Sequence, residues 1–281
     1  MNGWNVVDES DVLRRLQQGN GVRLELCRPE SLNALDDRLA IELRDALWRL
    51  AGDESVRCVL LTGSGRAFSA GADIKGGRQD SDEDRGERTM RVLREQINPA
   101  ILAIREMPKP VIAAVNGPAV GVGCSFAVAC DLVVAAESAY FLLAFANIGL
   151  LGDGGATLTV PGRVGLGRAG VLALLAERLS AADALAWGLA DRVVPDAELE
   201  ETVTGLAMRL AGGPTRAYAA TKRALNASCL AGLADQLELE AELQGELAVS
   251  GDHEEGVAAF REKRQPVFRG FEAPQPARAR S

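Results

Sequence analysis

Hydrophobic and polar positions recur along this chain with two periods, and each period predicts one kind of element. Val22, Leu24 and Leu26 alternate with polar residues, as in a strand that is buried on one face. Apolar runs predict further strands at 56–62, 111–115, 130–136, 140–143 and 190–194. Apolar residues at helical spacing predict helices at 36–52, 92–107, 119–130 and 162–179. Strands that alternate with helices indicate an α/β fold.

The pattern is purely helical after Pro195, and we expect helices at 197–210, 215–226, 233–249 and 253–264. Capping pairs predict helix starts at Ser180 with Asp183 and at Asp252 with Glu255. We predict a core of residues 1–195, a helical region of residues 196–271 and a tail of residues 272–281. The tail contains two Pro and two Arg and is predicted to be disordered.

Two polar segments interrupt this pattern. Residues 1–20 have few apolar anchors, which predicts an extension or an edge element. Residues 79–91 are almost purely charged, which is typical of a solvated loop or helix face. Because residues 79–91 follow a Gly-rich segment, they also fit a flap over a site, on positional grounds alone.

Two segments rich in Gly and Ala are candidates for a binding site. In the first, Gly63–Gly77, the backbone can take positive φ and its N–H groups can converge on an anion. It is not a P-loop, because no Gly-Lys-Ser/Thr closes it. The second, Pro110–Asp131, runs from a strand through a turn into a helix of small residues. The N-terminus of such a helix presents free N–H groups and positive potential.

Composition narrows the class of protein by exclusion. The chain has 281 residues, of which 47% are hydrophobic and 25% charged, as in soluble globular proteins. We expect no membrane association, since no apolar stretch reaches the ~18 residues that span a bilayer, and no secretory signal is visible. The net charge of −8 argues against nucleic acid as a partner. Five Cys without a CxxC pair are typical of a reducing cytoplasm.

Several motifs in order resemble the crotonase family, also called the enoyl-CoA hydratase/isomerase superfamily. They are AFSAGADIK, KPVIAAVNG, CDLVVAAESAYF, NIGLLGDGGAT and LSAADALAWGLADRVV, within about residues 21–268. The resemblance implies the ClpP/crotonase-like fold, with a repeated ββα spiral core and a C-terminal helical region that mediates trimer formation. It implies an acyl-CoA thioester substrate and a homotrimer or dimer of trimers, with no metal and no cofactor apart from the CoA of the substrate. Apolar residues after Pro195, such as Leu225, Leu233 and Leu237, provide surface for assembly.

The resemblance assigns two backbone N–H groups to an oxyanion hole, those of Ala72 and Val122. Such a pair stabilises the enolate of a thioester. Val122 stands where the family usually has Gly, so its side chain adds bulk at this position.

Hydratases of this family use two glutamates, and here their positions hold Ser125 and Phe145. Neither side chain has a pKa suited to moving a proton of water. One carboxylate remains, Asp153, at a position where isomerases of the family keep Asp. The segment FLLAFANIGLLGDGG is most similar to the ring-epoxide isomerase type of phenylacetate breakdown. We therefore predict an isomerase with Asp153 as acid and base.

Three alternatives stay open. In the first, Asp153 serves only the turn chemistry of its GDGG loop. The enzyme could be hydratase-like or catalyse another crotonase reaction, and a protein that only binds acyl-CoA is the third possibility. The resemblance also implies substrate-binding roles for a further set of residues, namely Ala70, Asp73, Ile74, Lys75, Ser125, Phe145, Phe260 and Lys263. His253, the only His, is predicted to be remote and structural.

Overall fold

The computed structural model describes residues 3–74 and 84–270, and its largest sheet has seven strands. In spatial order they are β1 (Asn5–Glu9), β2 (Leu13–Gln18), β3 (Gly21–Leu26), β4 (Cys58–Gly63), β5 (Val111–Val115), β7 (Leu132–Ala136) and β10 (Arg192–Val194). The first three pair antiparallel, and the pairs from β3 to β10 are parallel. A smaller sheet contains β6 (Ala119–Val120), β8 (Tyr140–Leu142) and β9 (Leu179–Ser180).

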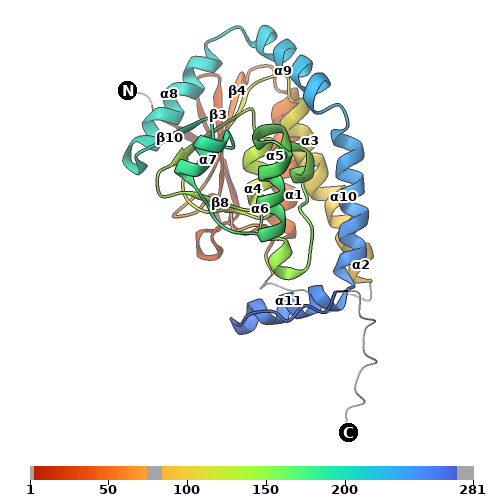
Figure 1. The fold of residues 1–281 in the computed structure, drawn as a ribbon. Helices are drawn as coiled ribbons and strands as arrows, with labels where there is room; N and C mark the ends of the chain where they lie inside the picture. Colours follow the sequence, from red (N-terminus) through yellow and green to blue (C-terminus); the bar gives the residue numbers. More distant parts are fainter. Residues whose placement is uncertain (1–2, 75–83, 271–281) are drawn as a thin grey trace.

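The central parallel strands are buried because helices cover both faces of the sheet. Every residue of β4 and β5 is buried, as expected for apolar runs without alternation. On one face α8 (Leu199–Ala211) packs on β3, β4, β5 and β7. Figure 1 shows α1 (Asp37–Gly52), α3 (Asn98–Glu106) and α4 (Val122–Ala129) on the other face. The strands predicted at 56–62, 111–115 and 130–136 are therefore confirmed as β4, β5 and β7.

The polar N-terminal segment forms the edge of the sheet. All five residues of β1 are exposed, and β2 joins β1 to β3. This confirms the expectation of an edge element within residues 1–20. Part of the charged segment forms α2 (Arg85–Val92), and its residues 79–83 lie outside the described residues.

Two of the predicted helices were wrong in extent. The helix predicted at 162–179 is two helices, α5 (Ala156–Val164) and α6 (Leu166–Leu175), separated at Gly165, whose φ is +81°. The helix predicted at 119–130 begins only at Val122. Its first residues form β6 instead, because Ala119 bridges Ser69 and the amide of Val120 donates to the Ser69 carbonyl.

The remaining helices complete the C-terminal half. They are α7 (Ala181–Trp187), α9 (Thr215–Cys229), α10 (Leu233–Ala248) and α11 (Gly251–Glu262), with 3-10 turns at Ala146–Ile148 and Asp196–Glu198. A further 3-10 turn, Pro29–Ser31, precedes α1. Ser180 caps α7 as predicted, by accepting a bond from the amide of Asp183. The predicted cap of α11 was wrong. The N-cap is Ser250 and not Asp252, and its side chain accepts a bond from the amide of His253.

Helix α10 packs on its own chain and thereby reaches the site. Leu233 and Leu237 are buried, and both lie against Gly155 in the loop before α5. A Cβ on Gly86 of α2 would lie 2.6 Å from the carbonyl oxygen of Gly245, so α2 and α10 are in close contact. Figure 1 shows α11 crossing the end of α10. Within the described residues, no helix has the length and apolarity needed to cross a bilayer.

Candidate active site

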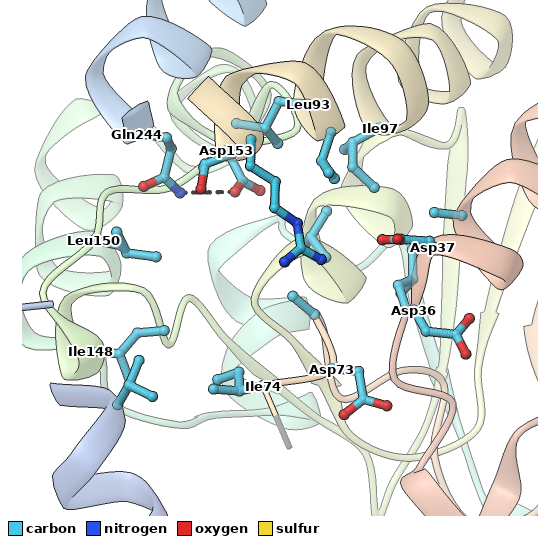
Figure 2. Close-up of a pocket in the computed structure, with 18 of the residues that line it drawn as sticks. Asp36, Asp37, Asp73, Ile74, Leu93, Ile97, Ile148, Leu150, Asp153 and Gln244 are labelled. Atoms are coloured by element: carbon cyan, nitrogen blue, oxygen red, sulfur yellow. Dashed lines mark hydrogen bonds between the residues drawn. The ribbon is translucent and has the colours of Figure 1, made fainter. Parts of the chain in front are cut away.

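A cavity of about 780 Å³ brings Ala72, Val122 and Asp153 together. It lies between the N-terminus of α1, the Gly-rich loop, the helix formed by α2 and the π-helical turn Leu93–Ile97, and α11. Figure 2 shows Asp153 and Gln244 across the cavity from Asp36 and Asp73. Aliphatic side chains form much of its wall: Leu35, Ala40, Ile74, Val92, Leu93, Ile97, Ile148, Leu150, Val257 and Ala258.

The amides of Ala72 and Val122 are neighbours because the residues that precede them are in backbone contact. Gly71 and Gly121 have positive φ values of +85° and +54°. A Cβ on Gly71 would lie 2.7 Å from the carbonyl oxygen of Val120 and 3.5 Å from the Cα of Gly121. Because only Gly allows so close an approach, these glycines fix the position of both amides.

Both amides are available to a ligand. Leu35 donates to the carbonyl of Gly71 and accepts from the amide of Asp73, at 2.7 and 2.9 Å. In this parallel bridge the N–H of Ala72 itself points away from Leu35. Val122 is the first residue of α4, where an N–H has no acceptor within the helix and the dipole adds positive potential. In the described part of the chain, neither amide has an acceptor.

The side chain of Val122 is accommodated by a neighbouring Gly. It is 4% exposed, and its Cγ2 lies 3.5 Å from the position that a Cβ on Gly154 would take. The bulk that the sequence predicts at this position therefore packs against the loop that carries Asp153.

Asp153 has one paired and one unpaired carboxylate oxygen. Oδ2 accepts a bond of 2.9 Å from Nε2 of Gln244, whereas Oδ1 is buried without a partner. The carbonyl of Asp153 accepts from Oγ of Ser125 at 2.7 Å and from the amide of Ala156 at 3.2 Å. Among the described residues, the carboxylate accepts no amide of its own loop, which argues against a purely turn-capping role.

Burial raises the pKa of Asp153 to about 7, from an ordinary value of 3.8. The bond from Gln244 opposes the shift because it stabilises the charged form, and the charge of Glu240 adds to the shift. A carboxyl group with this pKa can both accept and release a proton near neutral pH.

Ser125 and Phe145, which the resemblance places at the positions of the hydratase glutamates, lie behind the cavity wall. Ser125 is fully buried and its hydroxyl donates to the carbonyl of Asp153. Phe145 is 8% exposed, and its ring lies beside Gly121 and Gly152. Neither residue lines the cavity.

Sequence reasoning missed two buried residues of α10 that hold the loop of Asp153. Gln244 bonds Asp153, and Glu240 accepts from the amides of Gly155 and Thr157 at 2.7 and 2.9 Å. Burial raises the pKa of Glu240, and these bonds oppose the shift. Their spacing of four on a buried helix face was visible in the sequence. Their partners, more than 80 residues earlier in the chain, were not.

His253 lies on the cavity wall, so its predicted remote position was wrong. Its Nδ1 is 2.8 Å from the carbonyl oxygen of Ile148. Since a carbonyl only accepts, Nδ1 carries the proton and Nε2 is left as an acceptor. Burial lowers the pKa of His253; the bond with Ile148 opposes this shift and the charge of Arg85 adds to it, and the net shift favours the neutral ring.

Two of the predicted substrate-binding residues line the cavity where α11 meets the Gly-rich loop. The side chain of Asp73 pairs with Arg28 at 3.0 Å. The carbonyl of Ile74 accepts from Arg261 of α11 at 3.1 Å. Lys75 lies outside the described residues.

Ala70, Phe260 and Lys263 lie away from the cavity wall. The amide of Ala70 donates to Leu32, Phe260 is 49% exposed, and Lys263 ends α11 with a left-handed backbone. Their contact with CoA stays a prediction. Among the described residues, no group of His, Cys, Asp and Glu is arranged to hold a metal ion.

Comparison with known proteins identifies the family of this chain. The model of the enoyl-CoA hydratase/isomerase family matches residues 17–271, and the chain belongs to this family. A protein of Rhodobacter capsulatus named probable enoyl-CoA hydratase is 46% identical over 88% of this chain and 93% of its own. The 1,2-epoxyphenylacetyl-CoA isomerase of Escherichia coli is 40% identical over 92% of this chain and 98% of its own.

Solved structures show the same fold. The crystal structure of an enoyl-CoA hydratase from Mycobacterium avium subsp. paratuberculosis superposes with a TM-score of 0.83. It is 42% identical and covers 92% of this chain and 98% of its own. The predicted crotonase fold is therefore confirmed.

The raised pKa of Asp153 predicts a pH-dependent cost in stability. The unfolded chain loses this proton near pH 4 and the folded chain near pH 7, so the folded state binds more protons between these values. Stability contributed at this site therefore falls as pH rises through that window. Asp153→Asn has no group that titrates here. The free energy of unfolding of this variant in urea, relative to that of wild type, should therefore rise from pH 4.5 to pH 8. Parallel pH profiles of the two proteins would show that Asp153 titrates normally.

Proposed function

We propose that this protein isomerises acyl-CoA thioesters, with Asp153 as the group that removes and returns the proton. The observation that supports this most directly is a buried carboxyl group with one unpaired oxygen and a pKa of about 7, in a cavity that also holds two free amides. A protein that only bound acyl-CoA would not need such a group, whose burial is costly.

The proposed reaction conserves atoms and charge. Oδ1 of Asp153 takes a proton from the carbon α or γ to the thioester, and the electron pair moves to the thioester oxygen. The amides of Ala72 and Val122 stabilise this enolate oxygen. The same carboxyl group then returns the proton to the other carbon, so the double bond shifts and the mass is unchanged.

Hydration is the second candidate, since the Rhodobacter relative is named a probable hydratase. It requires one group to deprotonate water and another to protonate carbon. The hydroxyl of Ser125 is engaged by the Asp153 carbonyl and Phe145 has no titratable group, which favours isomerisation. Nε2 of His253 favours hydration, because it is an unprotonated nitrogen on the same cavity wall and an unprotonated nitrogen can accept a proton from water.

A panel of thioesters separates these candidates. We expect the wild-type protein to convert 3-enoyl-CoA or ring-derived acyl-CoA thioesters into isomers of equal mass. Hydration of crotonyl-CoA, followed by mass spectrometry, should be very slow. Water addition at the ~10–10³ per second of an efficient enzyme would reject the isomerase assignment and leave hydration.

Asp153→Asn tests the proton carrier. The variant keeps the size of the side chain but cannot act as a base, so turnover should fall by ~10²–10⁴-fold. CoA-thioester binding, measured by calorimetry, should be nearly unchanged, because in this proposal it depends on the amides of Ala72 and Val122 and on the other predicted substrate-binding residues. Near-normal turnover would place the base elsewhere, and a joint loss of binding and stability would favour a structural role.

We also propose a homotrimer or a dimer of trimers. Leu233 and Leu237 pack within the chain, but α6 exposes Leu166, Leu174 and Leu175, at 82%, 80% and 58%. So large an apolar surface is typical of an interface. Light scattering should give three or six times the chain mass of 29.7 kDa, and Leu174→Glu should yield smaller species. A wild-type monomer at micromolar concentration would contradict this.

We propose a reducing, cytoplasmic setting. All five cysteines are free thiols. Burial raises the pKa of Cys58, Cys124 and Cys130 to about 12, so these three thiols are unreactive.

A further inference from the structure

The side-chain amide of Gln244 has a fixed orientation. Its Nε2 donates to the carbonyl of Leu151 and to Oδ2 of Asp153, each at 2.9 Å. Because a carbonyl accepts only, the amino side of the amide must face Leu151, and the second hydrogen is then directed at Asp153. Gln244 is 1% exposed, so water does not compete for either bond.

This contact makes the two oxygens of Asp153 different. Oδ2 is occupied by Gln244, whereas Oδ1 is buried and unpaired. Figure 2 shows the bond from Gln244 reaching the carboxylate at the end of the cavity where Leu93 and Leu150 form the wall. A carboxylate held at one oxygen offers one defined atom to a proton of the substrate.

The loop around Asp153 is fixed as well, so its backbone cannot shift the carboxylate relative to Gln244 without breaking several bonds. Ser125 donates to the carbonyl of Asp153. Glu240, one helical turn before Gln244, accepts from the amides of Gly155 and Thr157. Both α4 and α10 therefore hold this loop from behind the cavity.

We propose that Gln244 is a positioning residue, which occupies Oδ2 of Asp153 and leaves Oδ1 as the atom that exchanges protons with the substrate. The inference rests on the proposed role of Asp153 as acid and base. Gln244 lines the cavity beside Asp153, and in this scheme it acts through the carboxylate.

A purely structural role, in which Gln244 only joins α10 to the loop, predicts that a substitution of Gln244 leaves the titration of Asp153 unshifted. The proposed role predicts a shift. A hydrogen bond donated to a carboxylate favours its charged form, so removal of the donor must raise the pKa of Asp153. The charge of Glu240 on α10 already raises it. The other ionisable groups on the cavity wall belong to α11, α2, the segments around α1 and the Gly-rich loop: His253, Glu254, Arg261, Arg85, Arg88, Arg28, Arg38, Asp36, Asp37 and Asp73. A substitution of Gln244 leaves all of them in place.

Gln244→Met tests the proposal, because Met has similar length and no donor. A bond to a charged group is worth enough to move the titration of Asp153 upward by about one to two pH units. The acidic limb of the kcat profile should move by the same amount. Turnover should then fall about 5- to 50-fold at pH 7 and recover by pH 10. Isotope-edited infrared spectroscopy of the free protein should show the same upward shift in the carboxyl titration.

Gln236→Met is the matched control. Gln236 lies two turns earlier on α10, and its amide donates to Oγ1 of Thr157 and not to Asp153. This variant should leave the titration of Asp153 and the pH limb unchanged. If Gln244→Met does not fold, Gln244→Glu takes its place, since a second carboxyl group beside Asp153 must also raise the titration.

Two results would overturn the proposal. One is a loss of turnover in Gln244→Met that is equal at every pH, with an unshifted carboxyl titration. The other is an equal shift in Gln236→Met. A wild-type protein without isomerase turnover would reject the proposed function alone, because the infrared titration of the free protein still tests the control of Asp153 by Gln244.

Discussion

The site depends on a close contact between two backbone segments, the Gly-rich loop and the turn that leads into α4. A Cβ on Gly117 would lie 2.2 Å from the carbonyl oxygen of Arg66, and one on Gly123 would lie 2.7 Å from Ser69. Together with the contact of Gly71 with Val120, glycines therefore stand at three close contacts between these segments. Any larger residue at such a contact must push the segments apart, and the two amides would then separate.

The same constraint explains why the fold can offer free amides at all. Buried N–H groups are almost always bonded, and most amides around Ala72 and Val122 are. The amides of Ala70, Asp73, Val120 and Gly121 all donate to carbonyls of neighbouring segments. These hydrogen bonds fix the backbone, so the amides of Ala72 and Val122 keep their direction although they have no partner among the described residues. Fixed donors of this kind are what the stabilisation of an oxyanion requires.

Much of this architecture could be predicted from sequence, because its causes are local. Apolar runs bounded by Pro or Gly fixed the positions of β4 and β5, and the order of motifs identified the Gly-rich loop and Asp153. The break at Gly165 was missed because apolar residues keep helical spacing on both sides of it. The contacts of Gln244 and the place of His253 were missed for another reason. Each meets its partner about 90 to 105 residues away in sequence, and no local pattern encodes such a meeting.

The residue at position 125 supports the proposed isomerase over a hydratase. Ser125 holds the carbonyl of Asp153, and its Cβ lies 3.0 Å from the position of a Cβ on Gly154. A Glu here would lose the bond that fixes the loop and would have to displace Gly154, together with the Val122 side chain that packs on it. Four residues thus pack on one another and depend on one another: Val122, Ser125, Asp153 and Gly154. The side chain that we propose as the proton carrier is therefore packed together with the side chains at three other positions, and these four positions bear more directly on the choice between isomerase and hydratase than overall identity to a relative does.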